Sequence, residues 1–196
     1  MFWLVVVIAL WGIVHSLLAS MGFKALFRRR LGDRFMRSYR LVYNLFAAVT
    51  FLPVLYLMVT LPDQPLYQVP APWRWFMLAG QGLSALLLLV AVLQTGLLSF
   101  AGLRQLVEEE ESGHLVTNGL YRFVRHPLYT FGLLALWLSP SMTVNSLIVY
   151  VSLTIYILVG IIFEERKLLR TFGQEYARYK SITPMLLPGL KPGGNK

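Results

Sequence analysis

Residues 127–163 read PLYTFGLLALWLSPSMTVNSLIVYVSLTIYILVGIIF, an apolar stretch of 37 residues without a charged side chain. One helical crossing of the hydrocarbon layer needs only about 20 residues, so this stretch is too long for a single span. The segment 139–141 (Ser-Pro-Ser) and Asn145 interrupt it near the middle, and polar or helix-breaking residues of this kind favour a turn. The stretch therefore predicts a hairpin of two membrane-spanning helices.

Three further apolar blocks precede the hairpin, and each is long enough to cross a membrane. They extend over residues 2–20, 41–61 and 76–103. The first block is too long for the core of a signal peptide and no basic segment precedes it, so we expect it to be retained as a span. The sequence thus predicts an all-α integral membrane protein with about five transmembrane helices.

The composition excludes several classes of protein. The chain of 196 residues is 57% hydrophobic and 14% charged, whereas a soluble domain carries roughly 25% charged residues. Because the chain contains no Cys, it can have neither disulfides nor thiolate zinc sites nor a catalytic Cys. Its three histidines, His15, His114 and His126, show no paired helical spacing, so we expect no metal site.

The basic residues predict the orientation of the spans. Of the 18 Lys and Arg residues, seven lie in 24–40, three in 104–125 and seven from 166 to the end, which leaves only Arg74 for the other side. Loops rich in Lys and Arg are retained in the cytoplasm, so we expect the N-terminus outside and a C-terminal helical segment in the cytoplasm. Contacts with anionic lipid headgroups account for the net charge of +9, and we expect membrane lipids rather than nucleic acid as partners.

Polar chemistry concentrates in the two segments that flank the hairpin, residues 108–129 and 164–179. Arg125 and His126 directly precede Pro127, and Glu164 and Glu165 directly follow the apolar run. A hairpin returns the chain to the side it left, so these four side chains should be neighbours. They form either a structural cluster of ion pairs or a cavity for a charged ligand that enters from the cytosol.

Two motifs in these segments resemble a known superfamily. Residues 115–129 resemble the pattern LVTxGxYxxVRHPxY, and residues 164–179 resemble the pattern EExxLxxxFGxEYxxY. Both patterns belong to the isoprenylcysteine carboxyl methyltransferase and phospholipid methyltransferase superfamily, and the resemblance covers residues 113–188. It implies a membrane-embedded enzyme that uses S-adenosyl-L-methionine. Residues 1–103 would then form a three-span membrane region and residues 104–196 a methyltransferase region that binds the cofactor.

The resemblance also implies roles for individual residues. The expected catalytic residues are Tyr121, Arg125 and His126. Arg125 would hold the carboxylate end of the cofactor, while Tyr121 and Tyr129 would face its sulfonium group. The expected cofactor-binding residues are His114, Leu115, Val116, Tyr121, His126, Pro127, Leu128, Tyr129, Glu164 and Glu165.

Two departures from the superfamily pattern bear on the cofactor-binding role of His114 and on the choice of substrate. His114 lies one place out of register with the family histidine, and Gly160 stands where the carboxyl methyltransferases carry an Arg that holds a substrate carboxylate. Residues 11–20 (WGIVHSLLAS) and 182–188 (ITPMLLP) are instead similar to a bacterial branch of methanethiol S-methyltransferases and NnrU-like proteins. This branch implies a location in the bacterial inner membrane. Within it, His15 and Ser16 either hydrogen-bond inside the bundle or reach the substrate pocket.

The sequence therefore favours methyl transfer to a small or lipid-soluble thiol, of the type that converts methanethiol to dimethyl sulfide. A small apolar thiol would partition into the bilayer and reach the enzyme between its spans. Two alternatives remain open. One is an isoprenylcysteine carboxyl or phospholipid N-methyltransferase, and the other is a non-enzymatic NnrU-like membrane protein.

Overall fold

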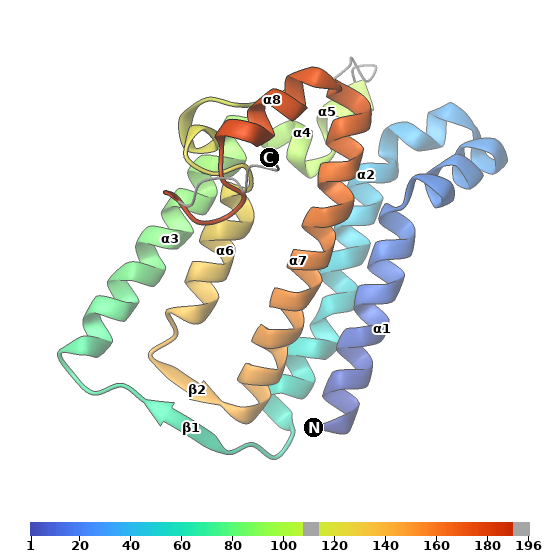
Figure 1. Cartoon of the computed structure of the whole chain (residues 1–196). Helices are drawn as coiled ribbons and strands as arrows, with labels where there is room; N and C mark the ends of the chain where they lie inside the picture. Colours follow the sequence, from blue (N-terminus) through green and yellow to red (C-terminus); the bar gives the residue numbers. More distant parts are fainter. Residues whose placement is uncertain (108–113, 190–196) are drawn as a thin grey trace. The chain divides into compact units, whose positions relative to one another are not determined.

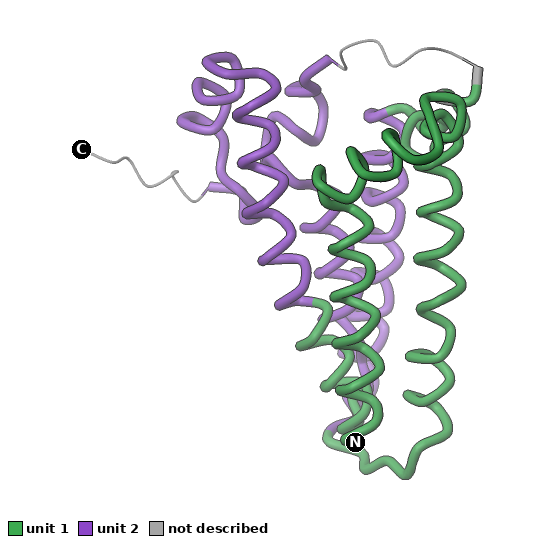
Figure 2. Tube along the Cα trace, turned by 90° about the vertical axis from the view of Figure 1, so that its right-hand side faces the viewer, with its two compact units in different colours: residues 1–66, 96–113, 142–153 green, residues 67–95, 114–141, 154–196 purple. Residues whose placement is uncertain are grey.

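The computed structural model describes residues 1–107 and 114–189, so the first six residues of the polar segment 108–129 lie outside the described residues. The helices and strands of the chain are labelled in Figure 1, and the chain divides into two compact units (Figure 2). Unit 1 comprises residues 1–66, 96–113 and 142–153, and unit 2 comprises residues 67–95, 114–141 and 154–196. Helices dominate both units, which confirms the predicted all-α class.

Within the described residues, four helices are long and apolar enough to cross a membrane, judged by their length and composition. They are α1 (Phe2–Ala19), α2 (Met21–Thr60), α3 (Trp73–Thr95) and α7 (Val144–Phe172). Many of their large apolar side chains are exposed, including Phe2 at 71%, Val59 at 73% and Phe163 at 63%. Water would oppose such exposure, so these surfaces fit contact with lipid, and the chain is an integral membrane protein.

In unit 1, α1 packs against α2 around a small apolar core of Leu4, Ile8, Val54 and Val149. The helix α2 is bent at Gly32, whose φ of 77° and ψ of 174° are not helical. The first turn of α7 is fixed by Asn145, which is 0% exposed and whose Nδ2 donates to the carbonyl oxygen of Leu61 over 3.2 Å. Asn145 was predicted in the turn and instead lies in the first turn of this helix, which begins at Val144.

The predicted span 76–103 is wrong at its C-terminal end. The helix α3 ends at Thr95, and Gly96, with a φ of 85°, separates it from the short helices α4 (Leu97–Ala101) and α5 (Arg104–Val107). The side-chain amide of Asn44 on α2 donates to the carbonyl oxygens of Phe100 and Ala101, over 3.0 and 3.1 Å. Apolar residues continue past Thr95, but the backbone leaves the helix at the glycine.

In unit 2, α3 packs against α6 (Pro127–Trp137). Gln81 on α3 donates to the carbonyl oxygen of Ala135 over 2.7 Å. With 11 residues, α6 is about 16 Å long, roughly half of a hydrocarbon layer. The first helix of the predicted hairpin is therefore present but short. The expected turn after it contains β2 (Ser141–Thr143), which pairs with β1 (Pro65–Gln68) in a two-stranded sheet.

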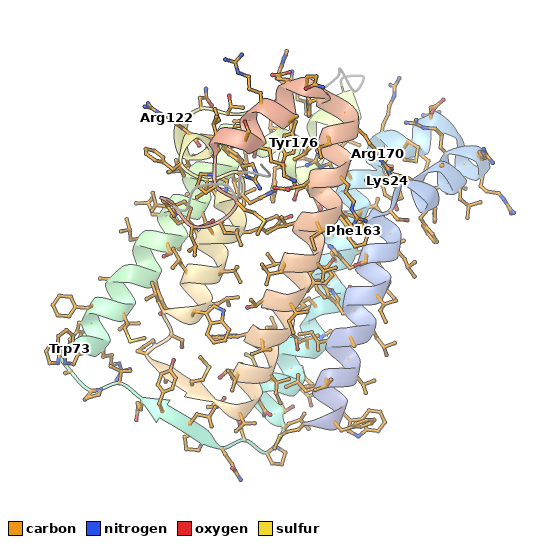
Figure 3. All side chains as sticks on the ribbon, viewed as in Figure 1. Lys24, Trp73, Arg122, Phe163, Arg170 and Tyr176 are labelled. Carbon is orange, nitrogen blue, oxygen red and sulfur yellow. The ribbon has the colours of Figure 1, made fainter. Side chains whose placement is uncertain are left out.

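Two short helical segments, η1 (Gly119–Arg122) and α8 (Gln174–Ile182), lie at the polar end of unit 2. Figure 3 shows Arg122 and Tyr176 at the end of this unit where η1 and α8 lie, and Trp73 at its opposite end. The polar and basic segments of unit 2 thus share one end of its helices.

Gly102 offers a test of the packing in unit 1. It is buried, with a φ of 89°, and a Cβ atom there would lie 2.5 Å from the backbone nitrogen of Leu41. We expect Gly102→Ala to lower the free energy of unfolding by about 2 kcal/mol or more, because the left-handed strain and the backbone clash add. Thermal unfolding in detergent would measure this loss.

The control is Gly22→Ala, because Gly22 is helical and a Cβ atom there would meet nothing within 4 Å. This change should leave stability equal or slightly higher. Equal unfolding temperatures for the two variants would contradict the packing described for Gly102.

Candidate functional site

The candidate site is built around the start of α6 in unit 2. Pro127 is the first helical residue, where its missing N–H costs nothing, and His126 precedes it as the N-cap. The backbone N–H groups of Arg125 and His126 donate to the carbonyl oxygens of Pro184 and Met185, over 2.8 and 3.2 Å. The extended segment after α8 therefore pairs with the backbone that leads into α6.

A second contact holds the same segment. The hydroxyl of Thr130, one turn into α6, donates to the carbonyl oxygen of Leu186 over 2.8 Å. These bonds explain why the ITPMLLP stretch belongs with the site although it carries no ionisable group. Its backbone carbonyls, rather than its side chains, fix the position of α6.

A buried ion-pair cluster joins α6, α7 and α8. The Glu165 side chain is 9% exposed, and its Oε1 lies 2.5 Å from Arg125 Nη2 and 2.7 Å from Arg125 Nε. Its Oε2 lies 2.7 Å from Lys180 Nζ. Arg125 Nη1 donates to the carbonyl oxygens of Lys180 and Thr183. Every nitrogen of the guanidinium group therefore contacts an acceptor of the protein.

The neighbouring carboxylate is in a different environment. The Glu164 side chain is 42% exposed, and its Oε2 accepts a hydrogen bond of 2.9 Å from the Tyr129 hydroxyl. His126 lies between the two glutamates, with Nδ1 3.9 Å from Glu164 Oε2 and Nε2 3.4 Å from Glu165 Oε1. The rings of His126 and Tyr129 stack at a centroid distance of 5.7 Å. Glu164 is thus oriented by the protein but open to a ligand.

Three tyrosines surround this cluster outside the spans. The Tyr179 hydroxyl donates to the carbonyl oxygen of Tyr121 over 2.6 Å. Burial raises the pKa of Tyr121, and the charge of Glu164 raises it further. Burial also raises the pKa of Tyr179 to about 12 against the opposing effect of Arg125. Both phenols remain protonated at neutral pH and can donate hydrogen bonds.

Tyr176, labelled in Figure 3, is the third tyrosine. It is 1% exposed. Burial raises its pKa, and the Glu165 charge adds to this effect, so the phenol lies near the ion-pair cluster. Its hydroxyl makes no hydrogen bond of normal geometry to the described part of the chain. Its interactions with Glu165 and Arg125 place this phenol beside the ion-pair cluster.

The four side chains expected to be neighbours are brought together, since Arg125 and His126 contact Glu165, and His126 also approaches Glu164. Pro127, Leu128 and Tyr129 follow on the first turn of α6. In contrast, His114 is exposed and Leu115 and Val116 are half-buried in the segment before η1. These three residues contribute no described hydrogen bond to the cluster, and their binding roles stay predictions.

Sequence reasoning missed three contributors to the site. Lys180 lies one residue beyond the polar segment 164–179 and completes the ion-pair cluster. Tyr176 lies inside that segment as part of the motif, without a predicted role. Gln94 on α3 accepts a hydrogen bond of 3.0 Å from the backbone N–H of Leu120, and nothing in its apolar surroundings indicated this contact.

Two hollows lie elsewhere, in unit 1. One of about 410 Å³ is lined by residues 96–99 and Arg104, and one of about 300 Å³ is lined by Trp11, Ala47, Ala48, Phe51 and Leu153. His15 stacks on Trp11, and its Nε2 lies 2.5 Å from the hydroxyl of Tyr43. The hydrogen bond within the bundle that was one interpretation of His15 is present.

The fold and the site define a class: an all-α integral membrane protein with a polar cluster where the last helices meet the C-terminal segment. The family model described as NnrU protein matches residues 3–189. The chain belongs to the NnrU protein family.

Several named relatives cover almost all of the chain. The chain is 31% identical over 197 residues to the methanethiol S-methyltransferase of Pseudomonas deceptionensis, covering 95% of this chain and 72% of the relative. It is 32% identical to methanethiol S-methyltransferase 1 of Bradyrhizobium diazoefficiens, covering 92% of this chain and 64% of the relative. It is also 32% identical to the methanethiol S-methyltransferase of Mycobacterium tuberculosis, covering 93% of this chain and 76% of the relative. The chain is thus shorter than these relatives. No solved structure gives a significant match.

The two adjacent glutamates should differ in their effect on stability. Glu165→Gln removes the counter-charge of the buried Arg125, so we expect the free energy of unfolding to fall by about 3 kcal/mol. Glu164→Gln acts on an exposed carboxylate, and we expect a change below about 1 kcal/mol. Thermal unfolding of both variants in detergent, followed by circular dichroism, would measure the difference. Equal losses would show that the burial of Glu165 has no energetic consequence.

Proposed function

We propose that this protein is a membrane-embedded methyltransferase that uses S-adenosyl-L-methionine and methylates a small apolar thiol, with methanethiol as the leading substrate. The observation that carries the proposal is the pair of adjacent glutamates in unit 2, one buried in ion pairs and one exposed beside Tyr129 and His126. The names of the relatives supply the substrate class and support methyl transfer as the reaction.

The residues present fit the proposed cofactor. When bound, S-adenosylmethionine supplies a methyl group on a sulfonium that is electrophilic enough for direct transfer. Glu164 is an exposed carboxylate fixed by the Tyr129 hydroxyl, which suits the cationic groups of this molecule. The hydroxyl of Tyr176 is a further buried donor beside Glu165. Pro127 and Leu128 would contribute apolar contacts at the first turn of α6.

The side chains of the site would act by binding, orientation and exclusion of water. Direct methyl transfer needs an aligned nucleophile rather than a covalent intermediate with the enzyme. Tyr129 and His126 would orient Glu164, and Tyr121 would donate from its neutral phenol. Arg125 would act as a positioning residue, because its guanidinium nitrogens already contact Glu165, Lys180 and Thr183. This assignment replaces the expectation that Arg125 holds the carboxylate of the cofactor.

An apolar thiol suits the chain better than a carboxylate substrate. Gly160 supplies no cation where the carboxyl methyltransferases carry an Arg, and a Cβ atom at Gly160 would meet nothing within 4 Å. A thiol must lose its proton before or during the transfer. His126, between two carboxylates and 4% exposed at its side chain, is the side chain best placed to accept a proton.

The topology that accompanies this proposal puts the site at the cytoplasmic surface of a bacterial inner membrane, with the N-terminus outside. Its support is the distribution of Lys and Arg along the sequence, in which Arg74 is the single basic residue outside the three basic segments. Cytosolic S-adenosylmethionine could then reach the site directly, while a lipid-soluble thiol would arrive through the bilayer.

The experiment that tests the proposal is methyl transfer in membranes that contain the full chain. Membranes are supplied with methyl-labelled S-adenosylmethionine and methanethiol, and the label in volatile dimethyl sulfide is measured. We expect Glu164→Ala to abolish labelling, with cofactor binding at least 100-fold weaker and the protein still folded, because the exposed carboxylate that receives the cationic groups is lost.

A matched control is Asp33→Ala, which removes a carboxylate that is 87% exposed in unit 1 and should leave activity unchanged. If the protein binds the cofactor but forms no labelled dimethyl sulfide, it is still a methyltransferase, and its substrate is a lipid or a prenylcysteine rather than methanethiol. A folded protein that binds no cofactor would contradict the proposal and favour a non-enzymatic role.

A further inference from the structure

The proposed cofactor carries a carboxylate as well as an ammonium and a sulfonium group, so its site needs a cation in addition to Glu164. Arg125 is poorly suited, because it is 8% exposed and its Nε, Nη1 and Nη2 atoms all contact acceptors of the protein. His126 is equally buried, at 5% exposure. The cation must therefore come from a side chain that combines exposure with a place in the cluster.

Lys180 on α8 has both properties. Its Nζ lies 2.7 Å from Glu165 Oε2, and its side chain is 43% exposed, whereas the Glu165 side chain is 9% exposed. A lysine ammonium has three N–H donors, and the pair with Glu165 uses one of them. Lys180 is thus anchored to the cluster on one side and open to a ligand on the other.

The charges around the two glutamates support the same conclusion. Arg125 and Lys180 bring two positive charges to the single negative charge of Glu165, so this part of the cluster has an excess of one positive charge. Glu164, the preceding residue, supplies a negative charge on the other side of His126. The site has a positive and a negative pole, a pattern that matches an amino acid zwitterion.

We propose that Lys180 binds the carboxylate of the cofactor's amino acid portion while Glu164 binds its ammonium group. The inference rests on the proposed function and adds a binding residue that the sequence motifs do not contain. Glu165 and Arg125 then act as positioning residues that hold Lys180 and α6 in place.

The test compares ligands that differ in the group Lys180 would bind. Binding to the full chain in detergent is measured by calorimetry for S-adenosylmethionine, S-adenosylhomocysteine, decarboxylated S-adenosylmethionine and 5′-methylthioadenosine. We expect Lys180→Gln to lower the affinity for S-adenosylmethionine and S-adenosylhomocysteine about tenfold or more, because one charge-assisted contact is lost. Binding of the two ligands without a carboxylate should not change, and Lys180→Arg should restore most of the affinity.

A matched control is Lys167→Gln, which removes an exposed positive charge from α7 of the same unit and should change none of the four affinities. An equal loss for all four ligands in Lys180→Gln would overturn the proposal, because it would show a purely structural role. Unchanged binding of every ligand would overturn it as well. If the unaltered protein binds none of the four, the proposed function fails together with this inference.

Discussion

The arrangement of unit 2 depends on one buried carboxylate, Glu165. A carboxylate removed from water is stable only where cations and hydrogen bonds replace its hydration, and here Arg125 and Lys180 do so from two other segments. Arg125 in turn reaches the carbonyl oxygens of Lys180 and Thr183, so the same interaction holds the end of α8. Polar contacts therefore hold the C-terminal segment, α6 and α7 together. Such contacts matter here because the hydrophobic effect contributes little to the association of helices that face lipid.

The proposed chemistry depends on the fact that backbone atoms, rather than side chains of the site, hold the start of α6. Backbone bonds from Arg125 and His126 to Pro184 and Met185 fix the N-terminal end of α6 without using any side chain of the site. Glu164 stays partly exposed, with 42% of its side chain accessible, while the Tyr129 hydroxyl and the buried partners keep it in place. Methyl transfer requires this kind of preorganisation more than it requires a reactive side chain.

Parts of this structure could be predicted from the sequence, and physical reasons explain the rest. The apolar blocks predicted the long helices, and the hairpin argument correctly predicted that Arg125 and Glu165 are neighbours. The end of α3 could not be predicted, because apolar residues continue past Thr95 and a hydropathy pattern carries no information on the positive φ of Gly96. The contribution of Lys180 depends on the turn at Gly173 that precedes α8, where the φ is 53°. No periodicity indicates such a turn.

The consecutive glutamates also explain how one short motif can serve both stability and binding. Successive residues on a helix point about 100° apart, so Glu164 and Glu165 must face different surroundings. One is enclosed with Arg125 and Lys180, and the other is exposed beside Tyr129. His126 approaches both carboxylates, so the ligand charge proposed at Glu164 would lie one imidazole away from the buried ion pairs of Glu165.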